Sequence, residues 1–352
     1  MPYRQLGYVI FLKGFSAVFG SYFDVVVVFI HAIFSLFAVH YFYSKMSSLF
    51  KLNIVLKIPL LAILLFPFFP PLSIANNLCS EGLSYGLYLL FIGIGMDMLF
   101  NTKHKNLKYF LIVYLALVFT RSQFVFSTLI FAGVYILIYR KSIFQRKHIL
   151  HTLVLCGIII IASITERTYH KLKDGFFKPT PLGYVSASTA PIYVSNKTDA
   201  SLIVQKDYKE IFQISYDSLV KKDLLLKPNQ TPREDYLFFH DNLPKICNQT
   251  VLDQAVRYYS TKKLPEGLSK KQVLSYPFFE SEAACKVFTI TLIKDNFKNW
   301  IQLYFTNISY GFYSPILLFF VIFMFFFSLI KTTVHYHKKY AILFLLSSLI
   351  LS

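Results

Sequence analysis

Long apolar runs, separated by short basic turns, are the feature of this sequence that most limits how it can fold. Residues 25–43 read VVVVFIHAIFSLFAVHYFY and residues 314–330 read SPILLFFVIFMFFFSLI. About twenty apolar residues are enough for a helix to cross the hydrocarbon core of a bilayer. Only 15% of the chain is charged, whereas soluble domains carry about a quarter. We therefore expect an all-α multispanning membrane protein with about seven or eight helices.

The apolar runs divide the chain into three regions. Residues 1–165 form an N-terminal helical membrane region, in which residues 1–23 are interfacial. Residues 166–313 form a large external segment of mixed structure after the sixth span, and residues 314–352 form C-terminal membrane helices. The last thirteen residues are too few to span a bilayer, which predicts a truncated chain. The predicted spans lie at about 25–43, 54–72, 81–100, 149–165 and 314–330, with a helical pair at 109–120 and 124–139 between the third of these and the fourth. The run 109–120 is too short to span unaided, so this pair is expected to meet at a recessed turn.

The basic turns predict the orientation of the chain. Alternating sides along the spans places the turns at 45–57, 103–108, 140–148 and 331–339 on one side, which the positive-inside rule makes cytoplasmic. Residues 166–313 then lie outside. This predicts a multi-pass protein of a bacterial inner membrane, with a large periplasmic loop. The excess of 36 basic over 18 acidic residues is explained by these turns, so nucleic acid is not an expected partner.

Acidic residues are rare outside the external segment, where only Asp24, Glu81 and Asp97 occur. A charge at membrane depth costs about 2.5–3.5 kcal/mol on insertion scales, so each needs a reason. Asp24 is expected to cap a helix, with catalysis as a secondary role, and Asp97 is expected to pair with Lys103 or Lys105. Glu81 follows a proline-broken loop and is either a first-turn acid favoured by the helix dipole or a functional carboxylate. Its polar neighbours are Asn76, Asn77 and Ser80, of which Ser80 is expected to cap the helix.

Arg121 lies in the turn TRSQ between two short apolar runs. It either extends to the lipid headgroups or uses its guanidinium to bind a phosphate in a bidentate manner. The alternation of spans puts Arg121 and Glu81 on the same side of the membrane. Together they predict chemistry on a lipid phosphate at the outer face.

The external segment offers further candidates and excludes some classes of site. Its start carries a cluster of polar side chains that is either a functional site or a solvated linker. Cys247 and Cys285 can form a disulfide in an oxidising compartment. The four cysteines have no zinc-ligand spacing, and no glycine-rich nucleotide-binding loop occurs. The polar cluster consists of Glu166, Arg167, His170, Lys171, Lys173 and Asp174.

Several segments resemble a family of GT-C type membrane glycosyltransferases, the bacterial relatives of dolichyl-phosphate-mannose protein mannosyltransferases. RQLGYVIFLKGFSAVFGSYF and the helix after it are similar to the family's first conserved segment. SEGLSYGLYLLFIGIGMDMLF resembles its helix that opens with an acid. LIVYLALVFTRSQFVFSTLIFAGVYILIY resembles its short helical pair, and GFFKPTPLGYVSAS resembles the start of a later outer loop.

This resemblance implies a hexosyl- or mannosyltransferase-like enzyme that moves a sugar from a polyprenyl-phosphate donor to an acceptor hydroxyl on a glycan, lipid or protein. Glu81 would be an assisting acid or a ligand for a divalent cation, Mg²⁺ or Mn²⁺. Arg121 would lie near the donor phosphate, with Arg4 and Lys171 as secondary candidates for the same contact. The lipid bilayer is the other expected partner.

The sequence also departs from the family. The first helix and the first-loop acid, which serves as general base in that family, have no counterpart here. Gln123 lies where the family's turn has a proline nearby. Three alternatives therefore remain: a surface-polysaccharide polymerase or ligase, a transporter of lipid-linked glycans, and a truncated, non-catalytic membrane protein. A transporter would carry more polar residues within its spans and inverted repeats, which the sequence lacks.

Overall fold

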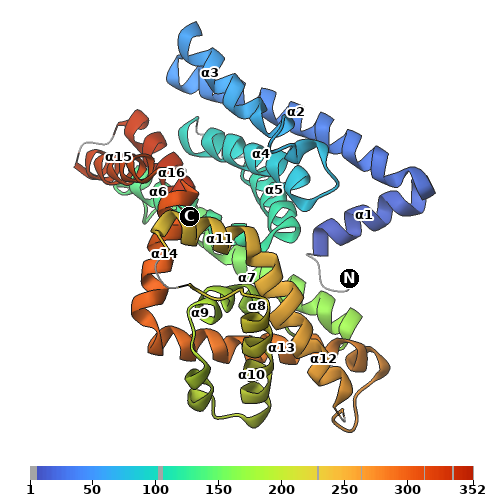
Figure 1. Cartoon of the computed structure of the whole chain (residues 1–352). Coiled ribbons are helices and arrows are strands. Elements are labelled where there is room, and N and C mark those ends of the chain that lie inside the picture. The colour runs from blue at the N-terminus through green and yellow to red at the C-terminus, as the bar shows by residue number, and fades with distance from the viewer. Residues whose placement is uncertain are drawn as a thin grey trace. The chain divides into compact units, whose positions relative to one another are not determined.

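Helices make up all the regular structure in the described part of the chain (Figure 1). The computed structural model describes residues 6–101, 106–227, 230–262, 264–312, 314–334 and 337–351. They form two compact units, one of residues 1–166 with 321–352 and the other of residues 167–320. The predicted all-α fold is thus confirmed. The prediction of mixed structure in residues 166–313 is wrong for the residues described, which form helices and the loops between them.

The first unit is built around helix α4 (Ser80–Phe100), most of whose residues are buried. Helix α2 (Phe23–Phe50) packs along it, and α5 (Leu107–Thr120) packs on it as well (Figure 1). Glycines on α4 permit these close approaches. A Cβ atom at Gly93 would lie 2.7 Å from the Tyr41 ring, and one at Gly86 would lie 2.7 Å from the Phe34 ring. Small residues let helix backbones approach closely in membrane proteins.

Replacing Gly95 by alanine should therefore destabilise the first unit. The new Cβ would lie 2.1 Å from the Phe131 ring and 2.9 Å from the Phe110 ring. Both rings are fully buried and pack against each other and against Phe91, so they have little room to move. We expect the free energy of unfolding to fall by about 1–3 kcal/mol, as measured by SDS titration.

Gly157→Ala is the matched control for this substitution. Gly157 also lies inside a helix, α7 (Arg146–Asp174), but a Cβ there would meet nothing within 4 Å. The substitution should be neutral, or stabilising by up to about 1 kcal/mol through helix propensity. Equal effects at the two glycines would contradict the packing argument.

Five helices in the described residues are long and apolar enough to cross a membrane, which is consistent with a membrane protein. The predicted span at 54–72 is shorter than expected, because α3 (Ile54–Leu65) and the 3-10 turn Phe66–Phe68 end before the prolines. Helix α5 is short, as its apolar run predicts. The C-terminal run forms α16 (Lys338–Leu351), which packs on α6 (Ser127–Tyr139). The five long helical stretches are Leu6–Phe50, which contains α1 (Leu6–Phe19), then Ser80–Phe100, Ser122–Tyr139, Arg146–Asp174 and Pro315–Val334 (α15).

Asp97 is buried near the C-terminal end of α4. Its carboxylate forms an ion pair with Lys45 of α2 at 2.7 Å and accepts hydrogen bonds from Asn101 Nδ2 at 2.8 Å and the Tyr41 hydroxyl at 3.3 Å. The predicted partners, Lys103 and Lys105, lie outside the described residues. The structure adds Lys45 as a partner, because α2 and α4 run side by side here (Figure 1).

The second unit surrounds α13 (Lys270–Asp295), on which α8 (Gly183–Ala187), α9 (Thr189–Tyr193) and α12 (Asp253–Thr261) pack. Its other helices are the 3-10 helix Lys197–Leu202, α10 (Lys206–Lys221), α11 (Pro232–Ile246), the π-helix Cys247–Leu252 and α14 (Phe297–Gly311). Glu282 of α13 accepts hydrogen bonds from the backbone N–H groups of Tyr184 and Val185, which fixes the start of α8.

Cys247 and Cys285 are buried in the core of the second unit. Both are free thiols, so the disulfide that their shared compartment would permit is not formed. Burial raises the pKa of Cys285 to about 12 and also raises the pKa of Cys247. Thiols of this kind act as small apolar side chains in a core rather than as nucleophiles.

Candidate functional site

The structure brings Glu81 and Arg121 into contact in the first unit. Glu81 lies in the first turn of α4, Arg121 directly follows α5, and their side chains form an ion pair. The carboxylate side chain is 46% exposed and the guanidinium side chain 27% exposed. Both groups can therefore be reached from outside the protein, and neither is locked into a buried pair.

Two neutral side chains complete the surroundings of the guanidinium. Arg121 Nη1 donates to Ser80 Oγ at 3.4 Å, and Nη2 donates to Gln123 Oε1 at 3.1 Å. Ser80 Oγ in turn donates to Glu81 Oε2 at 3.1 Å. Ser80 was predicted to cap α4, but that prediction is wrong. The N-cap is Cys79, which makes no side-chain cap, and the Ser80 hydroxyl is engaged by the ion pair instead.

The loop before α4 sets the position of Glu81. After α3 and its 3-10 turn, prolines exclude regular helix, and the chain folds back through a second 3-10 turn at Ile74–Asn76. Asn76 Nδ2 donates to the carbonyl of Phe68 at 2.7 Å, which ties the two turns together. Ser73 supports the reversal with a left-handed backbone, at a φ of 44°.

The position of Arg121 follows from the break between two helices. Its backbone is extended, with φ −150° and ψ 114°, so α5 ends there and the 3-10 turn Ser122–Phe124 begins. The N–H of Arg121 still donates to the carbonyl of Leu117 at 2.8 Å. The turn predicted from the letters TRSQ is thus present, and it directs the guanidinium toward the start of α4.

His31 is a residue of this site that sequence reasoning missed. It is fully buried on α2, and its Nδ1 donates to the carbonyl of Asn77 at 3.3 Å, in the loop that leads to Glu81. Its Nε2 is buried and has no hydrogen-bond partner among the described residues. A Cβ at Gly82 would lie 2.9 Å from Nδ1, so only glycine lets the imidazole sit this close to the start of α4.

A small cavity of about 150 Å³ opens beside the turn that carries Arg121. It has the volume of roughly five water molecules, and Ser122, Ser163 and Glu166 are its polar lining residues. Glu166, which sequence analysis placed at the start of the external segment, thus lines this cavity of the first unit. The apolar lining residues are Leu6, Val118, Phe119, Val125 and Ala162.

The other predicted site residues do not join the pair. Asp24 is exposed in the first turn of α2, where its Oδ1 accepts from the N–H of Val25 at 2.8 Å. The prediction that it is the N-cap is wrong, since that position is Tyr22. Lys171 is exposed and donates to the carbonyl of Gly175 at 3.5 Å, within the second unit. Arg4 lies outside the described residues.

The polar cluster at the start of the second unit is ordered rather than a solvated linker, because α7 continues through Asp174. His170 Nδ1 lies 2.6 Å from Asp174 Oδ2, and His170 Nε2 lies 3.1 Å from Thr180 Oγ1. Ser275 donates to the other carboxylate oxygen at 3.3 Å. Both ring nitrogens and both oxygens are thus engaged, as in a buried polar network that stabilises a fold.

The described residues form no preformed site for a divalent cation. They contain no group of three or more histidine, cysteine, aspartate or glutamate side chains able to hold a metal. Glu81 faces the guanidinium of Arg121, and Glu166 lines the neighbouring cavity. Mg²⁺ requires octahedral oxygen coordination and is usually held by one or two carboxylates with substrate phosphates and water. A cation placed at Glu81 would also be repelled by Arg121.

The Glu81–Arg121 pair is suited to binding an anion, because its guanidinium is partly exposed. The guanidinium presents a planar set of donors that matches the geometry of a phosphate or carboxylate. The Glu81 carboxylate can accept a proton once it is released from Arg121. No family model matches this chain, and comparison with curated proteins and with solved structures gives no match either.

Proposed function

We propose that this protein is a multispanning membrane glycosyltransferase of the GT-C type that moves a sugar from a polyprenyl-phosphate donor to an acceptor hydroxyl. The observation that carries the proposal is the partly exposed Glu81–Arg121 ion pair at the ends of two apolar helices. It combines a phosphate-binding cation with a potential general base, the two groups that such a transfer requires.

The ion pair suggests how the reaction starts. The donor phosphate replaces the Glu81 carboxylate on the guanidinium of Arg121, because a phosphate offers the same bidentate geometry with more charge. This releases Glu81 to accept the proton of the acceptor hydroxyl as its oxygen attacks the anomeric carbon. The bond from that carbon to the phosphate oxygen breaks, and the polyprenyl phosphate leaves with its charge balanced by Arg121.

The membrane setting is part of the proposal. The proposed site lies at the outer face of a bacterial inner membrane, with residues 166–313 in the periplasm, and the distribution of the basic turns supports this orientation. A lipid donor in the same leaflet would reach Arg121 by lateral diffusion. His31 and Ser35 of α2 support the start of α4 through Asn77 and Gly82, so they are expected to position Glu81 rather than to touch the substrate.

The test is transfer of a radiolabelled sugar from undecaprenyl-phosphate donors by the full chain in membranes. Glu81→Gln keeps the size of the side chain but removes the base, so the rate should fall by about a hundredfold or more. Arg146→Ala is the control, because Arg146 is an exposed cation at the start of α7, outside the candidate site. It should leave the rate unchanged.

Two results would contradict the proposal. One is a wild-type chain that transfers no sugar from any of these donors, and the other is wild-type activity in Glu81→Gln. The size of the product distinguishes the nearest alternative. Addition of one sugar per acceptor supports the glycosyltransferase, whereas transfer of preassembled repeat units would identify a surface-polysaccharide polymerase or ligase.

A further inference from the structure

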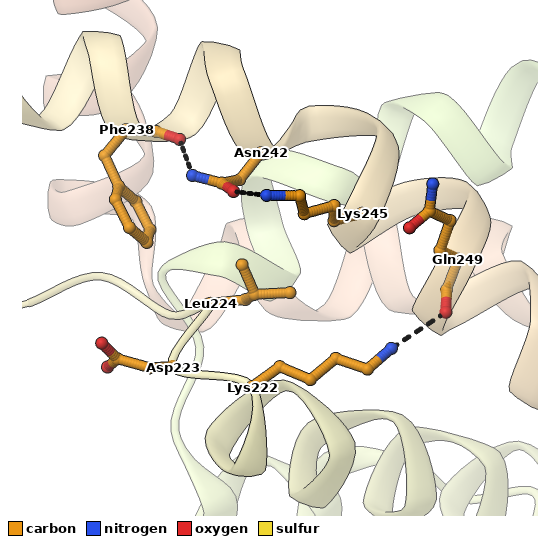
Figure 2. A pocket seen from close by; sticks show the side chains of 7 residues that line it. All are labelled: Lys222, Asp223, Leu224, Phe238, Asn242, Lys245 and Gln249. Carbon is orange, nitrogen blue, oxygen red and sulfur yellow. Dashed lines mark hydrogen bonds between the residues drawn. The ribbon is translucent and has the colours of Figure 1, made fainter.

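The second unit contains a cavity of about 350 Å³ that the proposed function does not use (Figure 2). It lies where the end of α10, the end of α11 and the π-helix meet. Two lysines line it, Lys222 directly after α10 and Lys245 in α11, and Asn242 and Gln249 line it as well. We call this cavity the lysine pocket. Its volume is at the lower end of those that hold small molecules.

Irregular backbone shapes the lysine pocket on two sides. The π-helix Cys247–Leu252 continues directly from α11, and such segments occur often at functional sites. Lys222 Nζ donates to the carbonyl of Gln249 at 3.1 Å (Figure 2). It also donates to Thr250 Oγ1 at 2.9 Å, so it joins the end of α10 to the π-helix. Asp223 then turns the chain away with a left-handed backbone, at a φ of 54°.

The charge in the lysine pocket is positive. Lys245 Nζ donates to Asn242 Oδ1 at 2.9 Å, and Asn242 Nδ2 donates to the carbonyl of Phe238 at 2.9 Å (Figure 2). Neither Lys222 nor Lys245 forms an ion pair with a described carboxylate. The one acid in the lining, Asp223, is neutralised by an ion pair with Lys227. Two ammonium groups therefore remain without a compensating carboxylate.

We propose that the lysine pocket binds the phosphate group of a small, water-soluble phosphate monoester such as a sugar phosphate. The two ammonium groups would hold the phosphate oxygens, and the amides of Asn242 and Gln249 would hydrogen-bond to hydroxyl groups of the ligand. Leu224 and Phe238 are the apolar side chains of the lining. They offer too little surface to cover an acyl or prenyl chain, so the ligand is a soluble phosphate rather than a lipid.

Calorimetric titration of the full purified chain with glucose 6-phosphate tests this proposal. Glucose 6-phosphate should bind more tightly than glucose, and added salt should weaken it. Lys245→Gln should weaken it by about tenfold, and Lys245→Arg should restore most of the affinity. Lys245 is the informative position because its ammonium group donates one hydrogen bond among the described residues, to Asn242 on its own helix. Lys222 also holds the π-helix, so its loss can affect folding.

Lys209→Gln is the matched control. Lys209 lies on α10 thirteen residues before Lys222, or about 20 Å along the helix axis, so the affinity should not change. Equal binding of glucose and glucose 6-phosphate would overturn the proposal, as would equal effects of the Lys245→Gln and Lys209→Gln substitutions. Binding of short-chain phosphatidic acid in preference to glucose 6-phosphate would also overturn it. This experiment measures binding, so its result does not depend on whether the chain transfers sugar.

Discussion

Arg121→Ala should reduce sugar transfer by the full chain by about a thousandfold, a loss typical of removing one preorganised group that stabilises developing charge. In the proposed reaction, the guanidinium would balance the charge of the departing phosphate, which grows as the sugar bond breaks. The loss should therefore appear in kcat as well as in kcat/KM. The measurement is initial rates at several donor concentrations, with the amount of protein in the membrane held equal.

A double substitution separates this role from a structural one. Glu81→Gln combined with Arg121→Ala should be little slower than the slower single variant, because groups that act in one step are strongly non-additive. Arg121→Lys keeps the charge but loses the bidentate geometry, so it should restore only part of the rate. Additive losses in the double variant, or full activity in Arg121→Ala, would contradict the assignment.

The largest expected effect on stability is at Asp97. The Asp97→Ala substitution removes a buried carboxylate and leaves Lys45 with an uncompensated charge beside α4, at an expected cost of about 3–5 kcal/mol. Tyr41 and Asn101 would lose a hydrogen-bond acceptor at the same time. SDS titration followed by circular dichroism would measure the difference in the free energy of unfolding.

Two further variants check the cause of this loss. Lys45→Met together with Asp97→Leu removes both charges and should recover a large part of the stability, because apolar replacement of a buried pair is often neutral. Asp24→Ala should cost less than about 0.5 kcal/mol, since Asp24 is exposed and contacts its own neighbour. A double variant as unstable as Asp97→Ala would show that the ion pair is not the cause.

Sequence reasoning reached the main parts of the candidate site. The scarcity of acids singled out Glu81, and the short apolar run before TRSQ singled out Arg121. Both arguments rest on the cost of charge at membrane depth, which needs no knowledge of the fold. The sequence did not indicate that the two side chains form an ion pair, because that depends on how α4 and α5 meet.

Other features depend on packing that no local pattern reveals. His31 lies in an apolar run, and no neighbouring residue indicates that it belongs to the site. Its contact with the start of α4 depends on the lack of a side chain at Gly82. The Lys45–Asp97 pair joins α2 to α4. Its formation depends on how these two helices align, and the charges next to Asp97 in the sequence do not predict that alignment. The second unit mixes polar and apolar residues, so its sequence predicts only mixed structure and not its short helices or its π-helix.

The pairing of Glu81 with Arg121 also has a consequence for how a substrate arrives. Two opposite charges in contact form a dipole, whose field fades with distance faster than that of a single charge. The long-range electrostatic attraction on a phosphate-bearing lipid would therefore be weak. The lipid would reach the site by lateral diffusion in the plane of the membrane. Its capture rate should then be nearly insensitive to ionic strength, unlike that of an enzyme whose cationic site stands uncompensated.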